Sequence, residues 1–249
     1  MAPLESSDRW RAAWRANLLQ ATWNYERQQG IGWAYAFQPV LERLYPDAAV
    51  RRERLAEHSA YFNTQPTMAS FALGAVAALE ERRAAGEAVD EASVARAKSV
   101  LGSALAALGD RLFWLTLRPF AACLGVLLAA AGSPLGAAVL WLAYNALHLG
   151  LRFGGVHAGY RQGPAVLGEA TRARFEALIG RLSLLGCLVL GALVAVLLVP
   201  AGSPRPMPWQ AALVGGLLFG LLSAMRSRPS PVQWSLGLGA LCLVAGWTT

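Results

Sequence analysis

A short apolar segment, residues 68–79, is the feature that most limits how this chain can fold. As a helix, twelve residues are about 18 Å long, whereas the hydrocarbon layer of a membrane is about 30 Å thick. The segment ends in the charged run 80–83, followed by the helix breaker Gly86. It cannot cross a membrane alone, so we expect either a buried core helix or a re-entrant half-helix.

Three uncharged polar residues and a proline precede this segment: Asn63, Thr64, Gln65 and Pro66. Asn63 or Thr64 can cap the helix, with Pro66 in its first turn, where the missing N–H does no harm. Capping needs one residue, and we expect Thr64 to provide it. Asn63 and Gln65 are then available to line a substrate path or to contact a partner protein.

The composition indicates a membrane protein. Of the 249 residues, 55% are hydrophobic and 15% are charged, against about 25% charged in an ordinary soluble domain. The net charge of +7 arises mainly in the second half, where basic residues lie beside apolar segments. The positive-inside rule explains this pattern better than nucleic-acid binding does, so no nucleic-acid partner is expected.

The N-terminal region, residues 8–46, is expected to be helical and amphipathic. Trp10, Trp14 and Leu18 recur at helical spacing with arginines between them, which suits a membrane interface; a solvated helix packed on its own domain is the alternative. Asp47 is placed to cap the next helix. The first residues contain no apolar signal-peptide core, so the N-terminus is expected in the cytoplasm.

Residues 66–118 are expected to form two half-length apolar helices on either side of a charged excursion. The second helix would end at Gly109, with Asp110 as the N-cap of a further helix or as a polar site residue. Half-helices with ends near mid-membrane build substrate sites in transporters. Neutral amides and hydroxyls suit a sugar, and the ring of Trp114 can stack on its C–H surface. The candidate residues for the substrate path or partner contact are Asn63, Thr64, Gln65, Asp110 and Trp114.

The second half contains longer apolar segments. Residues 119–153 form two of them, broken at 132–134, and 182–200, 209–225 and 232–247 are candidate transmembrane helices. The predicted fold class is an all-α membrane protein with amphipathic N-terminal helices, short re-entrant helical hairpins and C-terminal transmembrane helices. The predicted regions are N-terminal interfacial helices (1–60), a half-helix and hairpin transport region (61–165) and C-terminal transmembrane helices (166–249), all within one domain.

The sequence has no enzyme signature. It lacks a P-loop, a dinucleotide fingerprint, an HExxH motif and a CxxC motif. The three cysteines, Cys123, Cys187 and Cys242, lie far apart in apolar runs, and the three histidines are not at metal-ligand spacing. The chain is therefore expected not to be catalytic by itself and to need no metal or cofactor.

Five stretches carry a resemblance to a known family: WNYERQQGIGWAYAFQPVLERLYPD (23–47), YFNTQPTMASFALGAVAALEE (61–81), LGDRLFWLTLRP (108–119), RFGGVHAGYRQG (152–163) and LSLLGCLVLGAL (182–193). In this order they resemble the IID component of the mannose/fructose/sorbose class of the bacterial phosphoenolpyruvate-dependent sugar phosphotransferase system. The resemblance covers about residues 10–195.

The resemblance implies a translocator subunit in the bacterial inner membrane that pairs with a IIC subunit to carry a mannose-type hexose. Separate cytoplasmic IIA and IIB proteins would phosphorylate the sugar, through phosphohistidines that are not on this chain. Similar complexes are trimers of IIC–IID pairs. The sequence departs from the family at residues 102–107, which lack the usual proline, and at Arg111, where a small residue or proline is usual. Arg111 can pair with Asp110 and close the site, or favour an acidic sugar, so the alternative is a regulatory or structural subunit without sugar transport.

Overall fold

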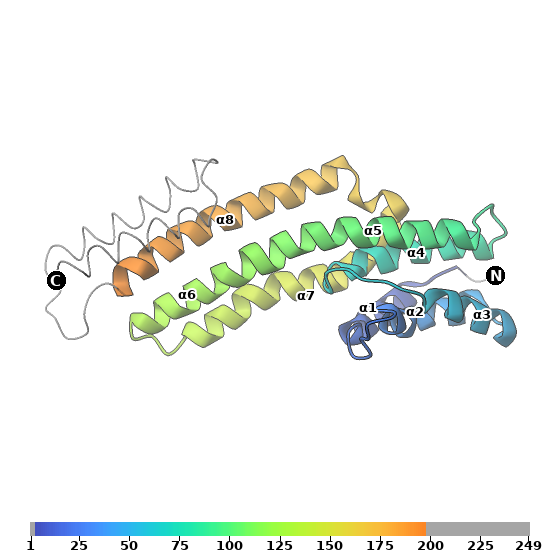
Figure 1. The fold of residues 1–249 in the computed structure, drawn as a ribbon, viewed down its shortest axis with the longest axis horizontal. Coiled ribbons are helices and arrows are strands. Elements are labelled where there is room, and N and C mark those ends of the chain that lie inside the picture. The colour runs from blue at the N-terminus through green and yellow to red at the C-terminus, as the bar shows by residue number, and fades with distance from the viewer. Residues whose placement is uncertain (1–2, 198–249) are drawn as a thin grey trace, which may run out of the picture. The chain divides into compact units, whose positions relative to one another are not determined.

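The computed structural model describes residues 3–197, and nearly all of its regular structure is helical (Figure 1). Within this range the β-type pairings are two isolated bridges that involve Gln28. The predicted all-α class is confirmed, whereas the candidate helices at 209–225 and 232–247 lie outside the described residues. The elements are α1 (Ser6–Arg15), η1 (Ala16–Leu18), α2 (Gly30–Leu44), α3 (Ala48–His58), α4 (Ala69–Ala84), α5 (Glu91–Leu112), the π-helix η2 (Phe113–Leu117), α6 (Arg118–Ala130), α7 (Gly136–Gln162), η3 (Gly163–Leu167) and α8 (Glu169–Leu197).

The chain divides into two compact units. Within the described residues, the first unit contains residues 3–115 and 142–179, and the second contains 116–141 and 180–197. Each unit therefore combines segments that are distant in the sequence, and α7 and α8 each contribute to both. The candidate site described below lies within the first unit.

The first unit begins with three helices that pack in series, because α2 contacts both α1 and α3. Asp47 caps α3 as predicted, since its side chain accepts hydrogen bonds from the backbone N–H groups of Ala49 and Val50. Residues 8–46 are helical over most of their length, as expected, but the helical structure is interrupted. The chain leaves the helix after η1 and turns through Gln28, which has a φ of 53°, before α2 starts.

Helix α4 contains nearly all of the apolar segment 68–79, and it is the core of the first unit. Phe71, Leu73, Val76 and Leu79 are at most 7% exposed. A helix that is apolar on all sides must be covered on all sides, and α4 contacts α2, α5 and η3. Helix α4 is thus covered by other helices, as either a core helix or a re-entrant half-helix requires.

Helices α4 and α7 approach each other at backbone distance. A methyl group at Gly74 would lie 2.0 Å from the carbonyl oxygen of Val156, and one at Gly159 would lie 2.1 Å from that of Phe71. The missing side chains therefore allow a contact that no other residue would permit, as is typical of closely packed membrane helices.

The predicted break at Gly109 was wrong, because α5 runs through this residue as one helix. With η2 and α6 it forms a continuous helical stretch, Glu91–Ala130, which is long and apolar enough to cross a membrane. The stretch Glu169–Val194 in α8 also meets this criterion. It contains most of the candidate transmembrane helix predicted at 182–200.

The second unit contains a helical hairpin, in which α6 and the start of α7 are joined at the predicted break. Gly132 has a φ of 82°, a conformation that favours glycine. A methyl group at Gly125 would lie 2.8 Å from the carbonyl oxygen of Gly136, and one at Gly136 would lie 2.4 Å from that of Gly125. Glycines thus permit both the turn and the close pairing of its two arms.

Candidate functional site

The polar segment before α4, residues 61–68, is held in place by a buried glutamine. The side chain of Gln29, 1% exposed, donates a hydrogen bond to the backbone oxygen of Thr64 (2.7 Å) and accepts one from its N–H (3.1 Å). The backbone N–H of Gln29 also donates to the oxygen of Phe62 (2.8 Å). These bonds satisfy buried backbone groups that lie outside any helix or sheet.

Thr64 does not cap α4, contrary to our expectation. Its hydroxyl donates a hydrogen bond to the backbone oxygen of Gly102 in α5, at 2.9 Å, and thereby ties the segment to that helix. Gln65 instead caps the turn that leads into α4, because its side-chain oxygen accepts hydrogen bonds from the N–H groups of Thr67 (2.8 Å) and Met68 (3.0 Å). Both Thr64 and Gln65 are 4% exposed, so each has a structural partner.

Two glycines of α5 form the surface on which this segment rests. A methyl group at Gly109 would lie 2.6 Å from Cβ of Gln65 and 2.7 Å from Cγ of Met68, and one at Gly102 would lie 3.2 Å from the ring of Phe62. Gly109 is therefore a contact position inside a helix, and Asp110 is an exposed residue of α5 rather than an N-cap.

Like Tyr61, the other exposed residue of the segment, Asn63 lines a pocket of about 360 Å³. Among the described residues its amide makes no hydrogen bond, so it can bind a ligand or a partner. The opposite wall is one face of α5, with the hydroxyl groups of Ser99 and Ser103. A volume near the lower end of the range for ligand sites suits a small polar molecule.

Lys98 also lines this pocket and is only 5% exposed. Its ammonium group donates a hydrogen bond to the backbone oxygen of His58 (3.0 Å) and lies 5.1 Å from the centre of the Trp33 ring. Within residues 3–197, no carboxylate oxygen lies within ion-pairing distance of this nitrogen. The pocket lining thus combines a buried cation, the acidic residues Glu57 and Glu91, neutral hydroxyls and the free amide of Asn63.

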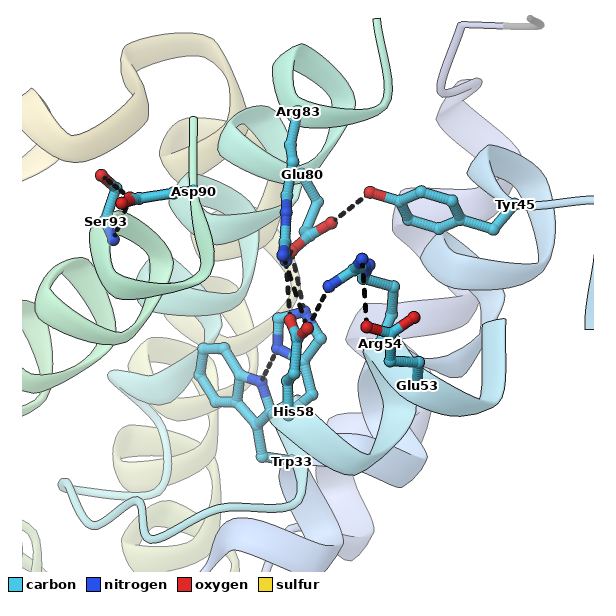
Figure 2. Close-up of polar contacts among 10 residues, drawn as sticks. Trp33, Tyr45, Glu53, Arg54, His58, Glu80, Arg83, Asp90 and Ser93 are labelled. Atoms are coloured by element: carbon cyan, nitrogen blue, oxygen red, sulfur yellow. Dashed lines mark hydrogen bonds and ion pairs between the residues drawn. The ribbon is translucent and has the colours of Figure 1, made fainter. Parts of the chain in front are cut away.

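A buried cluster around His58 and Glu80 joins α2, α3 and α4 (Figure 2). His58 also lines the pocket. Glu80 is fully buried and accepts hydrogen bonds from the hydroxyl of Tyr45 (2.7 Å) and from Arg83 (3.2 Å). His58 Nε2 lies 3.4 Å from the Glu80 carboxylate, and His58 Nδ1 accepts a hydrogen bond from the Trp33 indole (3.3 Å). Because an indole nitrogen can only donate, Nδ1 carries no proton, and the neutral ring has its proton on Nε2, facing Glu80.

The cluster shifts both pKa values downward. Burial lowers the pKa of His58, partly opposed by the nearby carboxylate, so the ring is neutral at pH 7. Burial alone would raise the pKa of Glu80, but the contact with His58, the hydrogen bond from Tyr45 and the charge of Arg83 outweigh it and bring this pKa to about 2. Glu80 is thus an ionised carboxylate inside the protein, balanced by its neighbours.

Three other positions singled out from the sequence, Asp110, Arg111 and Trp114, do not line the pocket. Arg111 forms a bidentate ion pair with Glu176 of α8, at 2.6 and 2.8 Å. Trp114 lies in the π-helix η2 and is 43% exposed. The described structure therefore brings Asn63 to the pocket and does not include Asp110 or Trp114 in its lining.

Sequence reasoning missed Lys98 and the His58–Glu80 cluster. Lys98 looked like one charge of a polar helix, and Glu80 looked like the charged end of an apolar one. The only available signal was that Glu80 follows the apolar run directly, without an intervening turn. Within residues 3–197, no group of three or more His, Cys, Asp or Glu side chains is arranged to hold a metal ion.

A protein-family model described as the PTS system mannose/fructose/sorbose family IID component matches residues 3–202. Similar curated proteins are the mannose-specific EIID component of Escherichia coli K12 (38% identical over 181 residues) and the sorbose-specific EIID component of Klebsiella pneumoniae (37% over 180 residues). The fructose permease IID component of Bacillus subtilis is 35% identical over 181 residues. These matches cover 72–73% of this chain and 64–66% of the relatives, so the chain matches slightly under two thirds of their length.

Two solved structures share the fold. One is a chain from the cryo-EM structure of the mannose transporter ManYZ in complex with microcin E492, with a TM-score of 0.64 and 30% identity; the match covers 100% of this chain and 98% of that one. The other is described as a membrane protein, with a TM-score of 0.72, 30% identity and coverage of 99% and 98%.

Proposed function

Because this chain belongs to the IID component family of the mannose/fructose/sorbose phosphotransferase systems, we propose that it is the IID translocator subunit of such a system. It would pair with a IIC subunit and carry a mannose-type hexose across the inner membrane. The observation that carries this proposal is the family match over residues 3–202, which includes every element of the candidate site. The likeness to a chain of a mannose transporter over the whole length supports it.

In this proposal the chain does no chemistry itself. Cytoplasmic IIA and IIB proteins transfer the phosphoryl group, and the assembly is a trimer of IIC–IID pairs. The N-terminus lies in the cytoplasm. The two apolar stretches, in α5–α6 and α8, are in keeping with this membrane role.

We assign Asn63 and its pocket to the sugar path. A sugar can be held by neutral donors and acceptors, and the amide of Asn63 and the hydroxyls of Ser99 and Ser103 provide them beside the charged residues of the lining, Lys98, Glu57 and Glu91. Thr64 and Gln65 hold the segment in position, because both are buried and engaged in hydrogen bonds. Asp110 and Trp114, both exposed, are proposed instead as contacts with the partner subunit.

Replacing Asn63 by Ala should weaken sugar uptake and leave the assembly of the complex intact. One lost hydrogen bond costs about 0.5–1.5 kcal/mol, which corresponds to roughly a two- to tenfold rise in the sugar concentration that half-saturates uptake. The measurement is uptake of labelled hexose by cells that contain all four components. Gln20→Ala removes an exposed amide outside the pocket and should behave as wild type. Unchanged uptake by Asn63→Ala would remove this residue from the sugar path, and loss of the complex would make it a partner contact.

Co-expression with the cognate IIC subunit should give a stable complex in detergent, whereas this chain alone should aggregate. The reason is that exposed apolar side chains on its membrane helices, such as Leu115 (73% exposed) and Leu185 (47%), need cover. Size-exclusion chromatography of the two preparations is the test, with an unrelated membrane protein co-expressed as the control. Recovery of a monodisperse, correctly folded chain without IIC would contradict the pairing.

A further inference from the structure

The N-terminal helix of the first unit buries its small residues and exposes its large aromatic ones. Ala12, Ala13 and Ala16 are at most 2% exposed. On the other side of the same helix, Trp10 and Trp14 are 51% and 70% exposed. This is the reverse of a surface helix of a soluble protein, whose large apolar side chains face the core.

The exposed side chains form one surface, which we call the aromatic face and define as Trp10, Trp14, Leu18, Trp23 and Tyr25. The first three follow at intervals of four residues along α1 and η1, so they share one side of the helix. Leu18 is 52%, Trp23 42% and Tyr25 88% exposed. An exposed group of aromatic side chains of this size marks a surface that is covered in the functional state.

The two tryptophans of α1 in the aromatic face pack against a side chain of helix α7. The rings of Trp10 and Trp14 lie 5.7 and 5.8 Å from the ring of Phe153 in α7. One turn earlier on α7, Leu149 is 39% exposed and extends the apolar surface. The contact with α7 thus fixes the positions of Trp10 and Trp14 on the surface of the first unit.

Two observations indicate what covers the aromatic face. Tryptophan and tyrosine combine an apolar ring with one polar group, and this chemistry is enriched where hydrocarbon meets lipid headgroups. The charges beside it are mostly basic: Arg11 is exposed on α1, Arg15 lies under the ring of Tyr35, and Arg27 follows Tyr25. Two acidic neighbours offset part of this charge: Glu26 lies 3.7 Å from Arg27, and Glu42 lies 3.5 Å from Arg11.

We propose that the aromatic face lies in the headgroup region of an anionic lipid bilayer, with the tryptophan rings at the level of the upper acyl chains. Arginines at its margin bind phosphate groups of the lipids. Helix α1 is then an interfacial anchor that fixes the first unit at the membrane surface. This inference rests on the membrane character of the family and stands whether or not the chain carries sugar.

The test is quenching of tryptophan emission in the complex with IIC, reconstituted into vesicles of phosphatidylcholine and phosphatidylglycerol. The difference in emission between wild type and the double variant Trp10→Phe/Trp14→Phe isolates these two rings. We expect lipids brominated near the headgroup to remove most of this difference emission, and lipids brominated deep in the chains to remove less. The matched control is Trp33→Phe, whose difference emission should resist both kinds of quencher because Trp33 is fully buried.

Three results would overturn the proposal. Quenching of the Trp10/Trp14 emission by aqueous iodide and not by brominated lipid would place the face in water. Resistance to both quenchers would place it against protein, and equal quenching in vesicles without phosphatidylglycerol would remove the role of the arginines. If the double variant does not fold, a nitroxide on Leu18→Cys, with the three native cysteines changed to Ala, gives the same information. It should collide with oxygen more often than with a water-soluble nickel complex.

Discussion

Replacing Glu80 by Ala should lower the free energy of unfolding by about 3–5 kcal/mol, because it leaves buried cationic and polar groups without their carboxylate. Arg83 would lose one of its two acidic partners, and Tyr45 would lose its acceptor. The measurement is the midpoint of thermal unfolding in detergent, on the chain or on its complex with IIC. Glu42→Ala is the matched control, since its pair with Arg11 is exposed and should contribute less than about 1 kcal/mol.

The pH dependence of the Glu80 effect provides a second, independent check. A carboxylate whose folded-state pKa lies below its unfolded value stabilises the fold above that unfolded value, and the stabilisation is lost as the pH falls through the folded pKa. For Glu80 these values are 4.5 and about 2. The glutamine of Glu80→Gln cannot titrate. The difference in the free energy of unfolding between wild type and this variant should therefore decrease as the pH falls from 4.5 to about 2. A difference that stays constant over this range would show that Glu80 is not ionised in the folded protein.

Replacing Gly159 by Ala should disrupt the contact between α4 and α7, at a cost at or above about 3 kcal/mol. The new methyl group would lie 2.1 Å from the carbonyl oxygen of Phe71 and 2.9 Å from the backbone nitrogen of Ala75. Backbone atoms on both sides cannot turn aside, so the two helices must separate, which exceeds the usual cost of overpacking a core with flexible side chains. We expect a large fall in the thermal midpoint or in the yield of folded protein.

The same substitution five residues earlier on the same helix supplies the control. A methyl group at Gly154 has nothing within 4 Å, so Gly154→Ala should be neutral or stabilising by up to about 1 kcal/mol, through the higher helix propensity of alanine. If Gly159→Ala lowers the stability and Gly154→Ala does not, the loss is due to the contact between α4 and α7. Equal effects of both substitutions would contradict that explanation.

Much of the fold could be predicted from apolar segment lengths and local capping. The length of residues 68–79 restricted α4 to a core or half-length helix, and Asp47 caps α3 as its position suggested. The break at Gly109 could not be judged in this way. A glycine in a helix normally weakens it, but here its missing side chain makes room for Gln65 and Met68, and tertiary contact outweighs local propensity.

The candidate site was predictable only in part. The polar segment could be recognised because burying amide side chains beside an apolar helix costs free energy unless they form hydrogen bonds. Which residue does what depends on distant partners: Thr64 binds the backbone of α5, and Gln65, not Thr64, caps the following turn. Lys98 and His58 are joined by a hydrogen bond between α5 and α3. No local pattern encodes such a pair, because it depends on how helices distant in the sequence pack.

The two hydrogen bonds between Gln29 and the backbone of Thr64 require a side chain that both donates and accepts. The side-chain amide of Gln29 pairs with the backbone of Thr64 as a peptide group of a neighbouring strand would. Its NH₂ group donates to the oxygen of Thr64, and its oxygen accepts from the N–H of Thr64. Hydrolysis of that amide to a carboxylate would turn the donor into a second acceptor and place two oxygens opposite each other. The burial that makes this exchange damaging also keeps water from the amide, so the segment that carries Asn63 is protected from such decay for as long as the fold stays closed.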